Sequence, residues 1–456
     1  MGSEAQSQTS RRVQNFISKR TLEIYPAGRV RWSMLCLTVL ATILASYEFN
    51  LAPLLPLLLP WLHMSTVGYG YFVAFAVLVS GISAFFGGPL ADRYGRVVVI
   101  DICLGCTTAL TFANLAITGM WSFIAIRTLM GVVAGLMAGA GAALVRDMSP
   151  RLSRALAFGM LSIGPVGSNW LVNFIAGVTL PIFHSWKSQI AIMGILGVGM
   201  YVPIVLWLKD LSVDLRHTIF ESERAALRSE IVSRPAVEVP KNARDAFRVI
   251  LAHPEIWLLV IGVNAFLLVY IAIQAFGPLM FTQVFHYSPA VSASINANFW
   301  LLNLAMLMTV GIISDRLQVR KPIAIAGALA TAALLIWWIP TFAHPLARPI
   351  VTLTAALLGG FLAIGYVPWA AMFSEALEDI SPAVQATGWA FYGLVLRFSA
   401  AITVPAMLIV VAHSGWQTWM WVCLGGVVAY CGVMVVVKGR WLPASLQTKT
   451  EVAPAA

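Results

Sequence analysis

Long apolar stretches recur along this chain from Arg31 to Lys438, separated by short polar breaks. Each stretch can cross a bilayer as an α-helix, which takes about 20 residues per crossing. Because lipid cannot satisfy backbone N–H and C=O groups, such segments cross the membrane as helices. Charged residues form 11% of the sequence, against roughly 25% in soluble domains, and mean hydropathy is +0.84. The sequence therefore predicts an all-α, polytopic membrane protein.

The polar breaks divide the apolar sequence into twelve expected transmembrane helices. They fall into two six-helix halves, 31–208 and 254–437, joined by a cytoplasmic linker, 209–253. An N-terminal tail, 1–30, and a C-terminal tail, 438–456, complete the expected organisation. The expected spans are 32–62, 67–90, 97–118, 121–145, 155–181, 188–208, 254–283, 290–313, 322–341, 349–371, 386–411 and 416–437.

The basic residues indicate the orientation of these spans. If the N-terminus is cytoplasmic, all but four of the 29 lysines and arginines lie on the cytoplasmic side. The exceptions are Lys187 and Arg348 in outer loops, and Arg127 and Arg397 within spans. Positive charge favours the cytoplasmic side of a membrane, so we expect both termini there, in an inner or plasma membrane. Anionic membrane lipids account for the net charge of +10, and no nucleic-acid partner is expected.

The two halves carry matching polar segments. "GPLADRYGR" begins at Gly88 and "GIISDRLQVR" begins at Gly311, each between the second and third spans of its half. "DMSP" from Asp147 and "DISP" from Asp379 each follow the fourth span of a half. Such repeated, pseudo-symmetric halves are characteristic of secondary transporters, whose substrate site lies near mid-membrane where the halves meet.

The segment from Gly88 to Arg96 closely resembles the loop 2–3 motif of the major facilitator superfamily (MFS). The copy from Gly311 to Arg320 lacks the second glycine. The resemblance covers about residues 30–440 and implies the MFS fold. It also implies that the motif makes cytoplasmic contacts that stabilise the outward-facing state. The expected conformational-switch residues are Gly88, Asp92, Arg93, Gly95, Arg96, Asp315 and Arg316.

Two further segments resemble motifs of the same family. "RTLMGVVAG" from Arg127 is similar to the fourth-span motif, and its glycines recur every four residues over Gly131–Gly139. That spacing lines one helix face and permits close helix contact. "GMLSIGPVGSN" from Gly159 partly resembles the fifth-span motif of proton-coupled antiporters, with Ser168 in place of a further glycine. Plain helix packing is the alternative interpretation of both sets of glycines.

Three ionisable residues lie deep in the expected spans. Glu48 is the only deep residue among the 19 acids, and Arg127 and Arg397 are the only deep cations. Such residues mark substrate or ion pathways, since each costs on the order of 3 kcal/mol to insert. Two arginines against one acid favour an anionic substrate, because a guanidinium offers paired donors to a carboxylate. Glu48 is then the expected proton-coupling site. Alternatively, Arg127 reaches the outer interface, and Arg397 forms a structural pair with Glu48 or a carbonyl.

Polar and aromatic residues at helical spacing complete the predicted substrate site. Buried amides need partners, which a ligand or water in a cavity supplies, and aromatic walls are typical of small-ligand pockets. Helix-to-helix hydrogen bonding and packing are the alternative roles. The expected substrate-binding residues are Arg127, Arg397, Asn169, Asn173, Tyr270, Gln274, Asn296, Trp300, Tyr366 and Trp369.

Within the superfamily, the first-span acid and fourth-span arginine resemble those of the proton-coupled organic and aromatic acid symporters. The eleventh-span cation is similar to that of carboxylate exchangers. We therefore expect a monomeric transporter that imports a small organic anion, a carboxylate or aromatic acid, with protons by alternating access. A proton-coupled drug or metabolite efflux antiporter is the alternative, and a receptor without transport is disfavoured by the repeated halves.

The sequence offers no sign of an enzyme. It has no nucleotide-binding glycine loop and no nucleophile constellation, so we expect no cofactor. All five cysteines fall in expected spans, and Cys103 and Cys106 lack the second ligand pair of a zinc site. No metal is expected.

Overall fold

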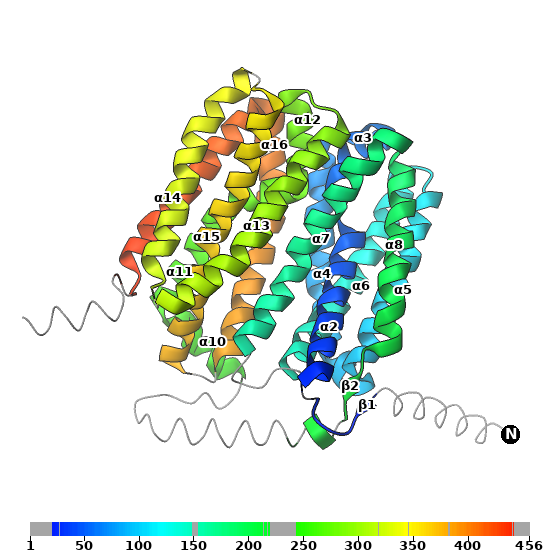
Figure 1. Cartoon of the computed structure of the whole chain (residues 1–456), viewed down its shortest axis with the longest axis vertical. Helices are drawn as coiled ribbons and strands as arrows, with labels where there is room; N and C mark the ends of the chain where they lie inside the picture. The colour runs from blue at the N-terminus through cyan, green and yellow to red at the C-terminus, as the bar shows by residue number, and fades with distance from the viewer. Residues whose placement is uncertain are drawn as a thin grey trace, which may run out of the picture. The chain divides into compact units, whose positions relative to one another are not determined.

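Helices dominate the computed structural model of the chain (Figure 1). Two two-residue strands, β1 (Thr21–Leu22) and β2 (Asp210–Leu211), pair in parallel, with Thr21 opposite Asp210. This small sheet is an addition to the predicted all-α architecture and leaves the fold class unchanged. The structure describes residues 21–26, 28–147, 154–212, 214–216, 218, 243–317, 319–344, 346–381, 384–439 and 441.

The described residues of the first half of the sequence form seven α-helices and two short 3-10 helices. They are α2 (Gly28–Phe49), η1 (Ala52–Leu54), α3 (Leu55–Trp61), α4 (Thr66–Tyr94), α5 (Arg96–Ala113), η2 (Asn114–Ala116), α6 (Met120–Asp147), α7 (Arg154–Phe183) and α8 (Trp186–Trp207). The second half forms α10 (Ala243–Ala252), α11 (Pro254–Phe266), α12 (Leu268–Phe285), α13 (Pro289–Leu317), α14 (Lys321–Trp338), η4 (Ile339–Ala343), α15 (Arg348–Ile380) and α16 (Gln385–Val436).

The described residues contain eleven helical segments that are long and apolar enough to cross a membrane. The last, Thr387–Val436, has 50 residues, or about 75 Å at 1.5 Å per residue, which is enough for two crossings of a core about 30 Å thick. Gly415 breaks this segment, because its φ of 78° is non-helical. The prediction of twelve spans is therefore confirmed, with a glycine kink inside α16 where a separate loop was expected.

The first span is broken at its middle. Helix α2 ends at Phe49, and the chain continues through η1 into α3. Pro53 has no N–H, so the carbonyl of Phe49, four residues earlier, loses the donor that a continuous helix would supply. The proline thus favours the end of the helix at this point. The break places Glu48 and Phe49 at the very end of a helix.

The chain forms two compact units. Unit 1 comprises Met1–Asn50, Phe75–Ser168 and Ser185–Val232, and unit 2 comprises Leu51–Ala74, Asn169–His184 and Ser233–Ala456. In unit 1, apolar side chains of α2, α5, α6 and α8 form a shared core, for example Leu44, Leu104 and Ile204. These four helices build the frame around Glu48.

Glycines of unit 1 allow helices to approach closely. A Cβ at Gly135 would overlap the carbonyl of Ser80 on α4, and one at Gly131 would lie 3.4 Å from the carbonyl of Ala76. The predicted glycine face of α6 therefore packs against α4 at these two positions. Gly164, from the segment that resembles the antiporter motif, lies equally close to Thr42 on α2. Its local role in this structure is helix packing.

Polar side chains also connect the helices of unit 2. Asn303 on α13 donates to the carbonyl of Gly359 on α15 at 2.8 Å. The buried Lys321, at the start of α14, donates to the carbonyls of Val435 (2.9 Å) and Val437 (2.8 Å). These carbonyls end α16, and a cation is favourable at the negative end of a helix dipole.

Candidate functional site

Glu48 is the second-to-last residue of α2 and is only 1% exposed. Its Oε2 accepts a hydrogen bond from the hydroxyl of Thr108 on α5, at 3.1 Å. Its Oε1 has no hydrogen-bond partner among the described residues. A buried carboxylate with so few hydrogen-bond donors is unfavourable in free energy, and binding a proton neutralises it.

Helix α8 makes room for this carboxyl. A Cβ at Gly197 would overlap Oε1 of Glu48 and would lie 3.5 Å from the side chain of Leu44. The Glu48 carboxyl is therefore held between Thr108 on α5 and Gly197 on α8. Neither of these two residues was predicted as part of the site.

We expect Gly197→Ala to displace the Glu48 carboxyl and to lower the rate of transport several-fold. The added methyl group would occupy the position of Oε1, so the side chain must leave its bond to Thr108. Gly199→Ala on the same helix is the matched control, since a Cβ there meets nothing within 4 Å. Initial transport rates of the two variants in proteoliposomes check this prediction. Equal rates would show that Gly197 does not position Glu48.

Arg127 binds the broken end of the first span. It lies on α6, is 4% exposed, and its Nη1 donates to the carbonyl of Glu48 at 3.3 Å. Its Nη2 donates to the carbonyl of Phe49, and its guanidinium lies over the Phe49 ring, 4.7 Å from the centroid. The carbonyls at a helix C-terminus lack helical donors and attract a cation. The guanidinium is thus directed into the protein, and the alternative in which it reaches the outer interface is wrong.

Four predicted aromatic residues of unit 2 form two ring pairs. The rings of Tyr270 and Trp300 meet edge to face, with centroids 5.1 Å apart, and those of Tyr366 and Trp369 lie 5.5 Å apart. Tyr392, which was not predicted, lies 5.0 Å from Trp369, and its hydroxyl is 3.5 Å from that of Tyr366. We call these five residues the aromatic cluster. It brings two tyrosine hydroxyls together among apolar rings.

The predicted amides form a second group in unit 2. Asn296 Nδ2 donates to Asn173 Oδ1 at 3.1 Å, and both side chains are fully buried. Asn173 Nδ2 donates to the carbonyl of Asn169 at 2.7 Å. The Oδ1 of Asn296 has no partner among the described residues, and a Cβ at Gly277 would contact it. The structure thus supports helix-to-helix hydrogen bonding for Asn173 and Asn296. The Asn296 Oδ1 is the acceptor that this bonding does not use.

The other two predicted side chains are more accessible. Arg397 on α16 is exposed, and its Nη1 donates to the carbonyl of Gly393, one turn earlier, at 3.2 Å. Gln274 on α12 is partly buried. Arg397 and Gln274 belong to unit 2, whereas Glu48 and Arg127 belong to unit 1.

The first switch motif connects α4 with α5. Gly95 has a φ of 96°, a conformation that favours glycine, and it lies between the two helices. Asp92 pairs with Arg96 at 3.7 Å; Asp92 is exposed and Arg96 is buried. Arg93 is exposed beside Tyr94, 5.3 Å from its ring centroid, and Gly88 lies within α4. A local ion pair therefore accompanies the turn.

Asp210 is the partner of this motif that the sequence interpretation missed. It is buried, its Oδ2 accepts the backbone N–H of Arg96 at 2.7 Å, and the same atom pairs with Arg216 at 3.1 Å. An anion at this position satisfies an unpaired N–H at the start of α5 and complements the helix dipole. Asp210 is the first acid after the sixth span. Its contact with Arg96 could not be predicted, because the two residues are 114 positions apart in the sequence.

The second copy of the motif makes different contacts. Asp315 pairs with Arg320 at 2.7 Å, and Arg320 also pairs with Glu375 on α15 at 3.2 Å. Arg320 further donates to the hydroxyl of Ser314 at 2.8 Å, whereas Arg316 is exposed. Arg320 is thus the central residue of this copy, although the sequence interpretation emphasised Arg316.

Residues 35–402 of the chain match the Major Facilitator Superfamily. The chain belongs to this family. It is therefore a multi-pass membrane protein of a transporter family. No group of three His, Cys, Asp or Glu side chains that could hold a metal occurs within the described ranges.

Individual relatives match parts of the chain. It is 31% identical over 149 residues to "Multidrug resistance protein MdtG" of Erwinia billingiae (strain Eb661), covering 31% of this chain and 36% of that protein. It is 23% identical over 197 residues to "Gallate transporter" of Pseudomonas putida, covering 43% and 42%. Each alignment thus spans less than half of the relative. The crystal structure of a D-xylose–proton symporter is 16% identical and shares the fold, with a TM-score of 0.67 over 90% of this chain and 98% of that one.

Proposed function

We propose that this transporter imports a small organic anion, a carboxylate or an aromatic acid, together with protons, by alternating access. It does so as a monomer in the inner membrane, with both termini cytoplasmic. The single observation that carries the proposal is the buried Glu48 carboxyl, which among the described residues has one donor, Thr108, and one oxygen without a partner. A buried carboxyl of this kind is suited to carry a proton, since burial penalises its charged form.

Arg397 supports an anionic substrate. A guanidinium carries five N–H donors, and the recorded hydrogen bond of Arg397 uses one of them on its own helix. Its exposed side chain can therefore offer a two-donor contact to a carboxylate. Arg127 is less available to a substrate in this structure, because it binds the carbonyls of Glu48 and Phe49. We assign it the supporting role of fixing the end of α2 beside the proton site.

The aromatic cluster supports an aromatic acid among the possible anions. Tyr270 and Tyr366 are partly buried, and aromatic walls with a few polar groups favour a small flat ligand. The relative named as a gallate transporter supports the same substrate class. Gln274, one helical turn beyond Tyr270, is the proposed amide contact of this site.

The amide pair and the switch motifs support alternating access. Asn173 comes from the first sequence half and Asn296 from the second, and both belong to unit 2. A transporter that opens between its two sequence halves must break hydrogen bonds that join them and form them again. We propose that the Asn173–Asn296 bond and the ion pairs of Asp92 and Asp315 are made in one state and broken in another.

Uptake into proteoliposomes tests the proposed function. With an inward proton gradient and a panel of short carboxylates, aromatic acids and cationic drugs, we expect one or more acids to accumulate. A protonophore should abolish that accumulation. If no acid accumulates, proton-coupled import of an organic anion is excluded.

The alternative function is proton-coupled efflux of a drug or metabolite. It is favoured by the similarity to "Multidrug resistance protein MdtG" and by the Gly164 segment. The same vesicles separate the two functions by direction. An antiporter would expel a preloaded compound as protons enter, whereas the proposed symporter would concentrate an acid inside.

A further inference from the structure

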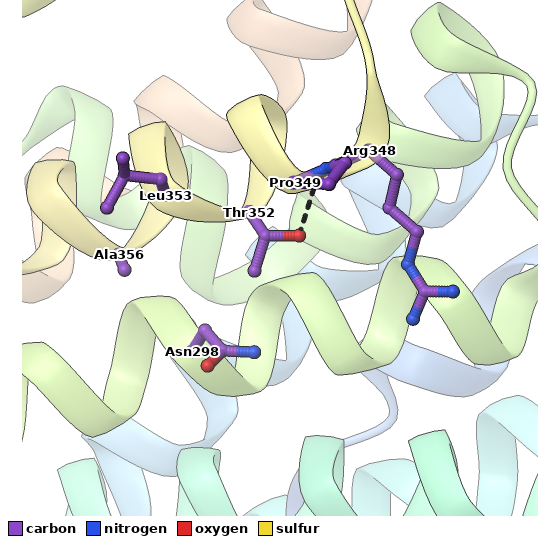
Figure 2. Close-up of a pocket in the computed structure, with 6 residues that line it drawn as sticks. All are labelled: Asn298, Arg348, Pro349, Thr352, Leu353 and Ala356. Carbon is purple, nitrogen blue, oxygen red and sulfur yellow. Dashed lines mark hydrogen bonds between the residues drawn. The ribbon is translucent and has the colours of Figure 1, made fainter.

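A cavity of about 570 Å³ opens on unit 2 between α13 and α15. Figure 2 shows the Arg348 side chain extending from the start of α15 toward α13, with Leu353 and Ala356 farther along α15. The cavity therefore has a cationic end and an apolar end. Its lining residues are Asn298, Arg348, Pro349, Thr352, Leu353 and Ala356.

The cationic end is available to a ligand. Arg348 is exposed, and its backbone carbonyl accepts a hydrogen bond from the Thr352 hydroxyl at 2.9 Å. Asn298 on α13 is exposed and donates to the carbonyl of Ser294 at 2.8 Å through its Nδ2. That nitrogen carries a second N–H, so Arg348 and Asn298 can both donate to an anion.

The apolar end faces the surroundings of the helices. Leu353 is 60% exposed, and Leu301 on α13 and Ile350 on α15 are exposed as well. In a membrane-spanning chain such side chains contact lipid tails. Arg348 itself opens α15 in the loop that the charge distribution predicts to be extracytoplasmic, at the level of the headgroups. A molecule with an anionic head and apolar tails therefore complements both ends of the cavity.

We propose that this cavity is a binding site for an anionic phospholipid of the outer leaflet. The phosphate binds the Arg348 guanidinium, Asn298 donates to the headgroup, and an acyl chain lies along Leu353. Charge complementarity selects an anionic lipid over a zwitterionic one, because the amine of a zwitterionic headgroup offsets its phosphate. The site lies on a membrane-facing surface and does not depend on which substrate is transported.

Native mass spectrometry of the full-length protein tests this proposal. The protein is titrated with phosphatidylglycerol and with phosphatidylethanolamine that has the same acyl chains. We expect the wild type to retain phosphatidylglycerol preferentially. Arg348→Gln should lose on the order of fivefold in that affinity, which is the effect expected from removing one cation near an anionic lipid surface. Lys187→Gln is the matched control, since Lys187 is the other cation in a predicted outer loop, and it should bind as the wild type does.

Leu353→Asn tests the apolar end separately. It should weaken binding of the full lipid while leaving the charge of Arg348 in place. Unchanged phosphatidylglycerol binding in Arg348→Gln would overturn the proposal. So would complete competition by inorganic phosphate, because the site would then be an anion site with no role for the acyl chain.

Discussion

Replacement of Glu48 by glutamine is expected to abolish accumulation of substrate under a proton gradient. A pH difference of one unit stores about 1.4 kcal/mol per proton, which sustains roughly tenfold accumulation of a substrate that moves with one proton. Glutamine has the size of glutamate and can still accept the hydroxyl of Thr108, but it cannot bind and release a proton. The variant should therefore let the substrate reach equal concentrations inside and outside the vesicles, without accumulation.

Exchange of labelled for unlabelled substrate separates coupling from binding. Glu48→Gln should retain part of this exchange, because the proposed substrate contacts in unit 2 are unchanged. Glu255→Gln is the control: Glu255 lies in the first turn of α11, where its Oε1 accepts the backbone N–H of Lys438, and accumulation should persist. Accumulation by Glu48→Gln at the wild-type level would exclude Glu48 as the proton site.

The fold could be predicted from the sequence because lipid leaves few choices of backbone structure. The apolar runs predicted the twelve spans, whereas the break in the first span was not predicted. The kink at Gly415 was not predicted, because a single glycine inside an apolar stretch does not reveal its φ. The β1–β2 pair was also missed, since two residues of strand carry no periodicity.

Single residues of the candidate site could be predicted, but their partners could not. Glu48 was conspicuous because a deep acid is rare. Thr108 and Gly197 are ordinary residues of apolar helices, and only the packing of α5 and α8 against α2 brings them to its carboxyl. Asp210 was missed for the same reason, because the folding of unit 1 joins it to Arg96.

Arg127→Met is expected to lower the stability of the folded protein as well as transport. The change removes the donors to the carbonyls of Glu48 and Phe49, which the break at Pro53 leaves at a buried helix end. A buried acceptor left unpaired costs about 1–3 kcal/mol. Thermal unfolding of the detergent-solubilised protein, followed by tryptophan fluorescence, should show a lower midpoint than the wild type.

Arg397→Met is the matched variant that separates this structural role from substrate binding. Its guanidinium is exposed and, among the described residues, bonds only to Gly393 of its own helix, so its removal should leave the unfolding midpoint unchanged. Affinity for the proposed anionic substrate should fall sharply in the proteoliposome uptake assay. Arg127→Lys restores the cation at the end of α2 with a single donor group, so its midpoint should lie between those of Arg127→Met and the wild type. If Arg127→Met kept the wild-type midpoint and lost only anion affinity, Arg127 would be a substrate ligand, and the end of α2 would need another partner.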